Sequence, residues 1–188
     1  MKVLLALIAA LALSACASPN VQAPSPRPAP EQEFYLGANV TKTVSENGTY
    51  LVLHDEIEYE TGTVVVAQIN SGTIDGLILI DNVGGYVIPA QDIGYAVRYH
   101  GVTTGVVGGC YSACVDVFVA GYTRVASSDA TFGIHAPSEE MYEADAEYYY
   151  TMGVPQMLKA TYAVPNSDMF YFDSYEAVEY GIATHLGS

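Results

Sequence analysis

The chain has 188 residues, of which 51% are hydrophobic and 14% charged, which is enough apolar material for the core of one ordinary domain. Its 6 basic and 21 acidic residues give a formal net charge of -15, so nucleic acid and anionic lipid headgroups would be repelled as partners. The histidines and cysteines show none of the spacings of a zinc site, and we expect neither a metal nor another cofactor.

The first fifteen residues, MKVLLALIAALALSA, form an apolar run that is too short to span a bilayer and is typical of a secretory signal. The run ends in LSAC, which resembles the lipobox of bacterial lipoproteins and implies a lipid-modified N-terminus at Cys16. An ordinary signal cleaved near Ala15 or Ala17 is the alternative. By the same resemblance Ala17 favours the outer membrane. We therefore expect a periplasm-facing lipoprotein of the bacterial cell envelope, which touches the membrane only through its lipid.

Residues 16–33 are rich in proline, alanine and serine and lack apolar periodicity, so an extended tether is predicted there. The folded domain is expected from residue 34 to residue 188. Apart from Cys16, the chain has only Cys110 and Cys114, an even pair in an oxidising compartment.

Strands and helices are predicted to alternate through the first part of the domain. The residue pattern predicts strands over 49–57, 76–82, 102–108, 123–128 and 131–137. It predicts helices between them, over 60–72, 86–100 and 111–121. This alternation is typical of βαβ units with right-handed crossovers.

Two further segments follow. Residues 139–150, EEMYEADAEYYY, predict a surface helix or a lid, or else a solvated helix whose tyrosines pack on the sheet. Residues 174–181 predict a short helix with Ser174 as its N-cap, followed by a final extended piece.

Glycine pairs follow two of the predicted strands, at residues 84–85 and 108–109. Backbone N–H groups in such turns can face a cavity and stabilise an oxyanion. Ser112 begins the next predicted helix, and His135 ends a neighbouring strand, from which it could take the serine proton. The alternative is a serine that only starts a helix and a histidine that packs in the fold.

The motifs DNVGG, GGCYSAC and FGIHAP resemble, in this order, those of the proteolytic subunit of the Clp protease and its relatives in the Clp and crotonase superfamily. EAVEYGI resembles the C-terminal helix of the same family. The resemblance implies an α/β fold of one domain, a spiral of repeated β-β-α units. It also implies a serine peptidase or hydrolase with a peptide or acyl substrate, and it leaves a homo-oligomer open.

Carried over by position, the resemblance makes Ser112 the nucleophile and His135 the general base. It makes the N–H groups of Gly84 and Ala113 the oxyanion donors. Asp116, on the same helical face as Ser112, would orient the histidine or serve a surface or capping role.

The resemblance assigns the third catalytic position less directly. The family's aspartate falls on Met169, and a one-residue insertion brings it to Asp168, which we take as the third member. Asn166 and Asp173 remain alternatives, as does a serine-histidine dyad.

If the turn around Ser112 is helical, the α-carbons of Cys110 and Cys114 would lie about 6 Å apart, inside the range of a disulfide. A bridge there would stiffen the turn, and two small buried thiols are the alternative.

After His135 the family has a longer helix and strand that build its double ring, whereas this chain has an acidic, tyrosine-rich stretch, so a double ring is in doubt. The function expected is a cell-envelope serine hydrolase, a peptidase acting on short or unfolded peptides through an acyl-enzyme. The alternative is a non-catalytic envelope protein of the same fold that binds peptides or assembles at the surface. A crotonase-like thioester enzyme comes third, because no segment resembles a coenzyme A site.

Overall fold

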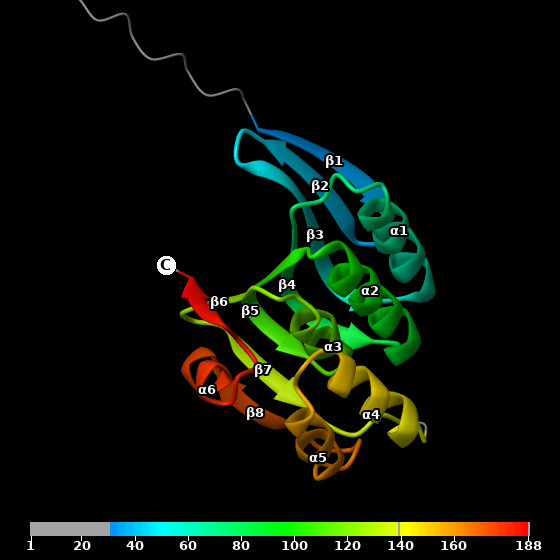
Figure 1. Ribbon diagram of the computed structural model, residues 1–188, viewed down its shortest axis with the longest axis vertical. Helices are drawn as coiled ribbons and strands as arrows, with labels where there is room; N and C mark the ends of the chain where they lie inside the picture. The colour runs from blue at the N-terminus through cyan, green and yellow to red at the C-terminus, as the bar shows by residue number, and fades with distance from the viewer. Residues whose placement is uncertain (1–30, 139, 188) are drawn as a thin grey trace, which may run out of the picture.

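The computed structural model describes residues 31–138 and 140–187 (Figure 1). The predicted signal sequence, the lipidation at Cys16 and most of the tether lie outside these residues. The first strand begins at Gln32, so the folded domain starts slightly before the predicted boundary at residue 34. Within the described ranges, no helix is both long enough and apolar enough to span a membrane.

Within the described residues, nine strands form one sheet in the order β1-β2-β3-β4-β5-β6-β9, with β7 paired to β5 and β8 paired to β7. The strands are β1 (Gln32–Gly37), β2 (Val40–Ser45), β3 (Gly48–Ile57), β4 (Gly76–Gly85), β5 (Thr103–Tyr111), β6 (Arg124–Ser127), β7 (Thr131–Ile134), β8 (Phe170–Asp173) and β9 (His185–Gly187). β3, β4, β5 and β6 run parallel, whereas β1, β2 and β3 form an antiparallel meander. The first half of β5 pairs with β6 and its second half with β7, so β5 joins the main sheet to a smaller extension.

Helices connect the parallel strands. They are α1 (Tyr59–Asn70), α2 (Val87–His100), α3 (Ala113–Val119), α4 (Tyr142–Thr151), α5 (Gln156–Tyr162) and α6 (Ser174–Glu179). In Figure 1, α1, α2 and α3 lie in a row along one face of the sheet, with α4 next to them.

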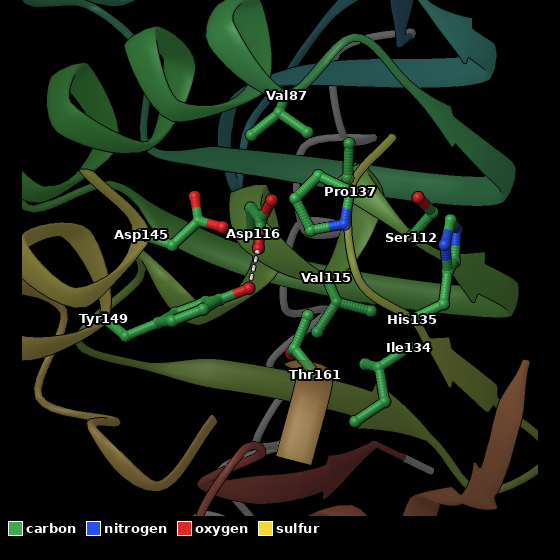
Figure 2. A pocket seen from close by; sticks show the side chains of 11 residues that line it. Val87, Ser112, Val115, Asp116, Ile134, His135, Pro137, Asp145, Tyr149 and Thr161 are labelled. Atoms are coloured by element: carbon green, nitrogen blue, oxygen red, sulfur yellow. Dashed lines mark hydrogen bonds between the residues drawn. The ribbon is translucent and has the colours of Figure 1, made fainter. Parts of the chain in front are cut away.

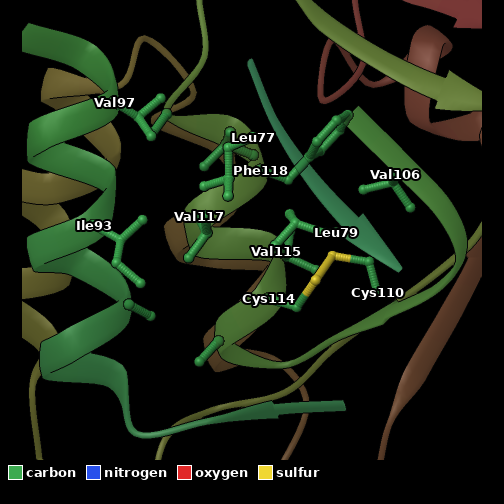
Figure 3. Packing of buried hydrophobic residues seen from close by; sticks show 14 of the residues in the cluster. Leu77, Leu79, Ile93, Val97, Val106, Cys110, Cys114, Val115, Val117 and Phe118 are labelled. Atoms are coloured by element: carbon green, nitrogen blue, oxygen red, sulfur yellow. A yellow bond between two sulfur atoms is a disulfide. The ribbon is translucent and has the colours of Figure 1, made fainter. Parts of the chain in front are cut away.

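The core lies between this row of helices and β4 and β5 (Figure 3). Leu77 and Leu79 point from β4 toward α3, where Val117 and Phe118 are fully buried. Each fully buried aliphatic or aromatic side chain of this kind contributes about 1.5–3 kcal/mol to folding. The turn that carries Ser112, described below, leads directly into α3, all of whose residues are buried.

Each element predicted from the sequence is present, although several bounds differ. β4 and β5 run three residues further than the predicted strands, as far as Gly85 and Tyr111. α6 begins at Ser174, but its N-cap is Asp173, whose Oδ1 accepts hydrogen bonds from two backbone N–H groups. The sequence pattern did not predict β1, β2, α5 or β8.

The acidic, tyrosine-rich segment forms α4, which packs on the core. Tyr148 is fully buried and donates a hydrogen bond to the backbone oxygen of Asp116 over 2.6 Å. Gly94 on α2 makes this contact possible, because a Cβ at that position would overlap the Tyr148 hydroxyl. α4 is thus anchored by its tyrosines, as one alternative predicted, but Tyr148 packs on α2 and α3 and not on the sheet.

Candidate active site

Ser112 occupies a sharp turn between the end of β5 and the first residue of α3. Its backbone has φ 53° and ψ -128°, a conformation that non-glycine residues rarely adopt. Such strain costs about 1–3 kcal/mol and persists where the surrounding structure enforces it. A strand-to-helix turn of this kind exposes the serine hydroxyl above the sheet edge in α/β-hydrolases.

A disulfide brackets this turn. Cys110 and Cys114 are bonded, their α-carbons lie 5.4 Å apart, and both side chains are fully buried. The predicted bridge is confirmed. Because it closes a ring around Ser112, it restricts the backbone that carries the hydroxyl.

β7 places His135 beside Ser112. β5 and β7 are parallel with Tyr111 opposite Gly133, and the Ser112 N–H donates a hydrogen bond to the Gly133 oxygen over 2.8 Å. Because parallel strands end at the same edge, Ser112 and His135 leave the sheet on the same side. Both line an open cleft of about 180 Å³ and a smaller cavity behind it, at whose edge Figure 2 shows both side chains.

The imidazole is oriented by a backbone carbonyl, which also accepts a hydrogen bond from the Asn166 amide. His135 Nδ1 lies 2.8 Å from the Ala136 oxygen, and Asn166 Nδ2 lies 3.1 Å from the same oxygen and 3.2 Å from Nδ1. A carbonyl oxygen can only accept, so this contact is a hydrogen bond when Nδ1 carries the proton. In that tautomer Nε2 is unprotonated, which is the state a general base requires.

The structure brings Asn166 to His135, but not the two aspartates named from the sequence. Asp168 is exposed, and its Oδ1 accepts a hydrogen bond from the backbone N–H of Met169. Asp173 caps α6 and pairs with Thr131, at the opposite end of β7 from His135. Of these candidates for the third position, only Asn166 contacts the histidine within the described residues.

The glycine pair at the end of β4 differs in detail from the prediction. The Gly84 N–H, which the sequence analysis assigned to the oxyanion hole, donates a hydrogen bond to Asn82 Oδ1 over 3.0 Å. The next N–H after the glycine pair, that of Tyr86, donates to the Ile57 oxygen over 3.0 Å.

Gly85 lines the open cleft together with Ser112. Gly84 packs below the nucleophile turn with φ 94°, and a Cβ there would lie 2.5 Å from the Tyr111 oxygen. Ala113 lines the smaller cavity beside Ser112. Because the Gly84 N–H is engaged by Asn82, Gly85 is the residue of the glycine pair that remains a candidate for an oxyanion donor, together with Ala113.

The smaller cavity, of about 20 Å³, extends from Ser112 and His135 to a buried polar floor (Figure 2). Its floor contains Asp116 from α3, Asp145 and Tyr149 from α4, and Thr161 from α5, and its walls are apolar. Asp116 Oδ1 accepts a hydrogen bond from the Tyr149 hydroxyl over 2.7 Å. Asp116 is thus buried at the cavity floor, and neither a surface nor a capping role applies to it.

Burial, opposed by the hydrogen bond from Tyr149 and assisted by the nearby Asp145 carboxylate, raises the pKa of Asp116 to about 7. The pKa of Tyr149 lies well above its usual value, chiefly because of burial. Asp116 therefore changes its charge near neutral pH, while its hydroxyl partner stays protonated.

Asp116→Asn is expected to remove a pH-dependent loss of stability. The folded protein holds the Asp116 proton up to about pH 7, whereas the unfolded chain releases it near its ordinary value of 3.8. The stability that the protonated carboxyl contributes is complete below pH 3.8, the pKa in the unfolded chain. It is lost as the pH rises through about 7, the pKa in the folded protein. Asparagine still accepts the Tyr149 hydrogen bond but does not titrate. The free energy of unfolding of the variant, relative to that of the wild type, should therefore rise by about 2 kcal/mol between pH 5 and pH 7.

Urea denaturation at both pH values measures this difference. Glu147→Gln, on the exposed side of α4, removes the same charge outside the cavity and serves as the control. A stability difference that does not change with pH would contradict the prediction.

Within residues 31–138 and 140–187, no three His, Cys, Asp or Glu side chains are grouped so as to hold a metal ion.

Solved structures with a similar fold include ClpP proteins. ClpP1 from Listeria monocytogenes matches with a TM-score of 0.61 and 20% identity over 74% of this chain and 91% of that chain. The ClpP protease catalytic domain from Plasmodium falciparum matches with a TM-score of 0.59 and 18% identity over 73% of this chain and 83% of that chain. No protein-family model and no curated protein matches the sequence. The likeness confirms the predicted fold class, an α/β domain of the ClpP type.

Proposed function

We propose that this chain is a serine hydrolase of the cell envelope, a peptidase that cleaves short or unfolded peptides through an acyl-enzyme. One observation carries the proposal. Ser112, on a positive-φ turn enclosed by a disulfide, and His135, from the adjacent parallel strand, line the same cleft. The fold shared with ClpP proteases supports a peptidase in particular.

In the proposed reaction, Ser112 Oγ attacks the scissile carbonyl carbon while His135 Nε2 takes the hydroxyl proton. The negative charge that develops on the carbonyl oxygen is stabilised by the N–H groups of Gly85 and Ala113. The intermediate then breaks the carbon-nitrogen bond, and His135 returns its proton to the leaving amine. Water, deprotonated by the same imidazole, hydrolyses the ester and restores Ser112.

The Ala136 carbonyl, which also accepts a hydrogen bond from the Asn166 amide, takes the orienting position that a carboxylate holds in a full triad. The carbonyl fixes the tautomer and the ring direction. It carries only a partial negative charge, so it stabilises the imidazolium less than an aspartate would. We therefore expect a slow hydrolase whose turnover is limited by the proton-transfer steps.

The envelope location rests on the signal-like leader, the lipobox-like LSAC sequence and the Pro-rich segment that follows. The Cys110–Cys114 disulfide adds support, because such bonds persist in oxidising compartments such as the periplasm.

A second candidate function is a non-catalytic protein of the same fold that binds peptides in this cleft. It is favoured by the histidine's surroundings, since the described residues place no carboxylate on His135 Nδ1, and Asn166 lies there instead.

Reaction with a fluorophosphonate distinguishes the two candidates. The hydrolase predicts one covalent adduct per chain, mapped by peptide mass spectrometry to Ser112 and absent after heat denaturation. An unmodified Ser112 in folded protein, after reagent concentrations that label a reference serine hydrolase fully, would favour the binding protein.

A further inference from the structure

The cavity behind Ser112 is small, and it opens at the point where a peptide would be attacked. Its free space of about 20 Å³ holds one group about the size of a water molecule. Ser112, Ala113 and His135 line it, so its opening lies beside the position of the attacked carbonyl. The open cleft of about 180 Å³ shares Ser112 and His135 with it. A peptide bound in the cleft would therefore place part of one residue at this opening.

Bond geometry decides which residue of the peptide that is. The Cβ atom of the residue on the acyl side is two bonds from the attacked carbon, whereas the Cβ atom of the leaving residue is three bonds away. The leaving nitrogen must also face His135, because the imidazole returns a proton to it. The side chain on the acyl side is therefore the one that begins closest to the cavity.

Apolar side chains form the walls of the cavity near Ser112. They are Val87, Val115, Ile134 and Pro137. In Figure 2, Val87, Val115 and Pro137 lie between Ser112 and the polar side chains of Asp145 and Tyr149. Contact with such walls stabilises a methyl group, because its apolar surface leaves water.

Hydrogen bonds fix the floor of the cavity and so limit its size. Asp145 accepts on both carboxylate oxygens, from Gln91 on α2 over 2.8 Å and from Tyr162 on α5 over 2.7 Å. Asp116 accepts from the Tyr149 hydroxyl over 2.7 Å. These carboxyl groups are buried, so a side chain that pushed their donors aside would leave a buried acceptor without its partner. The cavity therefore resists enlargement by an incoming side chain.

We propose that this cavity receives the side chain of the residue on the acyl side of the scissile bond, and that it selects alanine. The alanine methyl group fills the space and contacts the apolar walls. Glycine leaves this contact unmade, and a longer side chain extends onto the hydrogen-bonded floor. The inference rests on the proposed function, because it takes Ser112 as the point of attack, and it adds the substrate class, peptides that are cleaved after alanine.

Hydrolysis of a series of substrates tests this preference. The substrates are N-acetyl tripeptide coumarin amides that differ only in the residue before the coumarin, which is glycine, alanine, 2-aminobutyrate or leucine. The value of kcat/KM for alanine should exceed that for glycine by a few-fold, since one methyl group is buried. It should exceed that for 2-aminobutyrate by about tenfold and that for leucine by at least about a hundredfold.

A change in the wall should shift this preference. Val87 is only partly buried and lines both the cavity and the open cleft, so Val87→Ala widens the cavity toward the cleft. It should raise kcat/KM for 2-aminobutyrate, relative to alanine, by at least about fivefold. Val178→Ala is the matched control, because Val178 is 38% exposed on α6 and lines neither the cavity nor the cleft. It should leave the ratio unchanged.

Equal kcat/KM for alanine and leucine, or a ratio that Val87→Ala does not change, would overturn the inference. Equal values that still require Ser112 would reject the alanine subsite and keep the hydrolase.

Calorimetry with the Ser112→Ala protein measures the subsite without hydrolysis. N-acetyl tripeptide amides that end in alanine should bind at least about tenfold more tightly than those that end in leucine. This preference, found together with no hydrolysis by the protein with Ser112 intact, would keep the subsite and reject the hydrolase. Equal binding, or no binding, together with no hydrolysis would reject both.

Discussion

Ser112→Ala is expected to lower kcat for a peptide coumarin amide by at least about ten-thousand-fold, because no other group can form the acyl-enzyme. The fold should be retained, since alanine fits where the serine Cβ already lies. Ser112→Gly should be equally inactive, but about 1 kcal/mol more stable than Ser112→Ala, because glycine adopts φ 53° without strain. Steady-state kinetics and urea denaturation measure the two effects.

The control for this prediction is Ser71→Ala, at the exposed C-cap of α1 and outside the cleft. It should keep wild-type kcat. Residual activity of Ser112→Ala above about one per cent of wild type, in protein free of contaminating hydrolase, would remove Ser112 from the role of nucleophile.

His135→Ala is expected to lower kcat by about a thousand-fold to ten-thousand-fold, because the hydroxyl loses the base that takes its proton. The rate that remains should rise with pH up to the alkaline range, since hydroxide then replaces the imidazole. Addition of free imidazole should restore part of the activity, which a purely structural role for His135 would not allow. The pH dependence of kcat, measured with and without imidazole, tests this.

His100→Ala is the matched control, because that imidazole is exposed and contacts Asn70 on α1. It should change neither kcat nor its pH dependence. If His135→Ala kept the wild-type rate, proton transfer in this protein would have to use another group.

The central strands were predictable because burial on both faces leaves continuous apolar runs, such as GLILI at the start of β4. β1 was not, because most of its side chains are exposed at the sheet edge and little of its sequence is selected by burial. β8 is four residues long with a single buried side chain, Phe172, which gives no period that a sequence pattern can reveal. Edge elements of this kind are fixed by tertiary pairing.

In the site, strand ends that meet at one edge of a parallel sheet allowed Ser112 and His135 to face each other, and the resemblance of GGCYSAC and FGIHAP to the Clp motifs assigned them as nucleophile and base. The choice between Gly84 and Gly85 depends on the direction of one N–H group, and the hydrogen bond from Gly84 to Asn82 decides it. The Ala136 carbonyl left no signal at all, because any residue supplies a backbone oxygen.

The cavity floor also escaped prediction, since it joins Asp116 to side chains from two later helices. Asp145 and Thr161 stand far from Asp116 in the chain, and α5, which carries Thr161, was not predicted. An aspartate in the otherwise apolar run of α3 was the one visible signal. The sequence left its role open between orienting the histidine and a surface or capping position, and it did not show which groups would face it.

The crystal structure of the folded protein after reaction with a fluorophosphonate tests the central claim most directly. The account predicts a phosphorus–oxygen bond to Ser112 Oγ, with the phosphoryl oxygen about 2.7–3.1 Å from the N–H groups of Gly85 and Ala113. His135 Nε2 should lie within hydrogen-bond reach of Oγ. An adduct whose phosphoryl oxygen faces solvent, or a His135 ring directed away from Ser112, would contradict it.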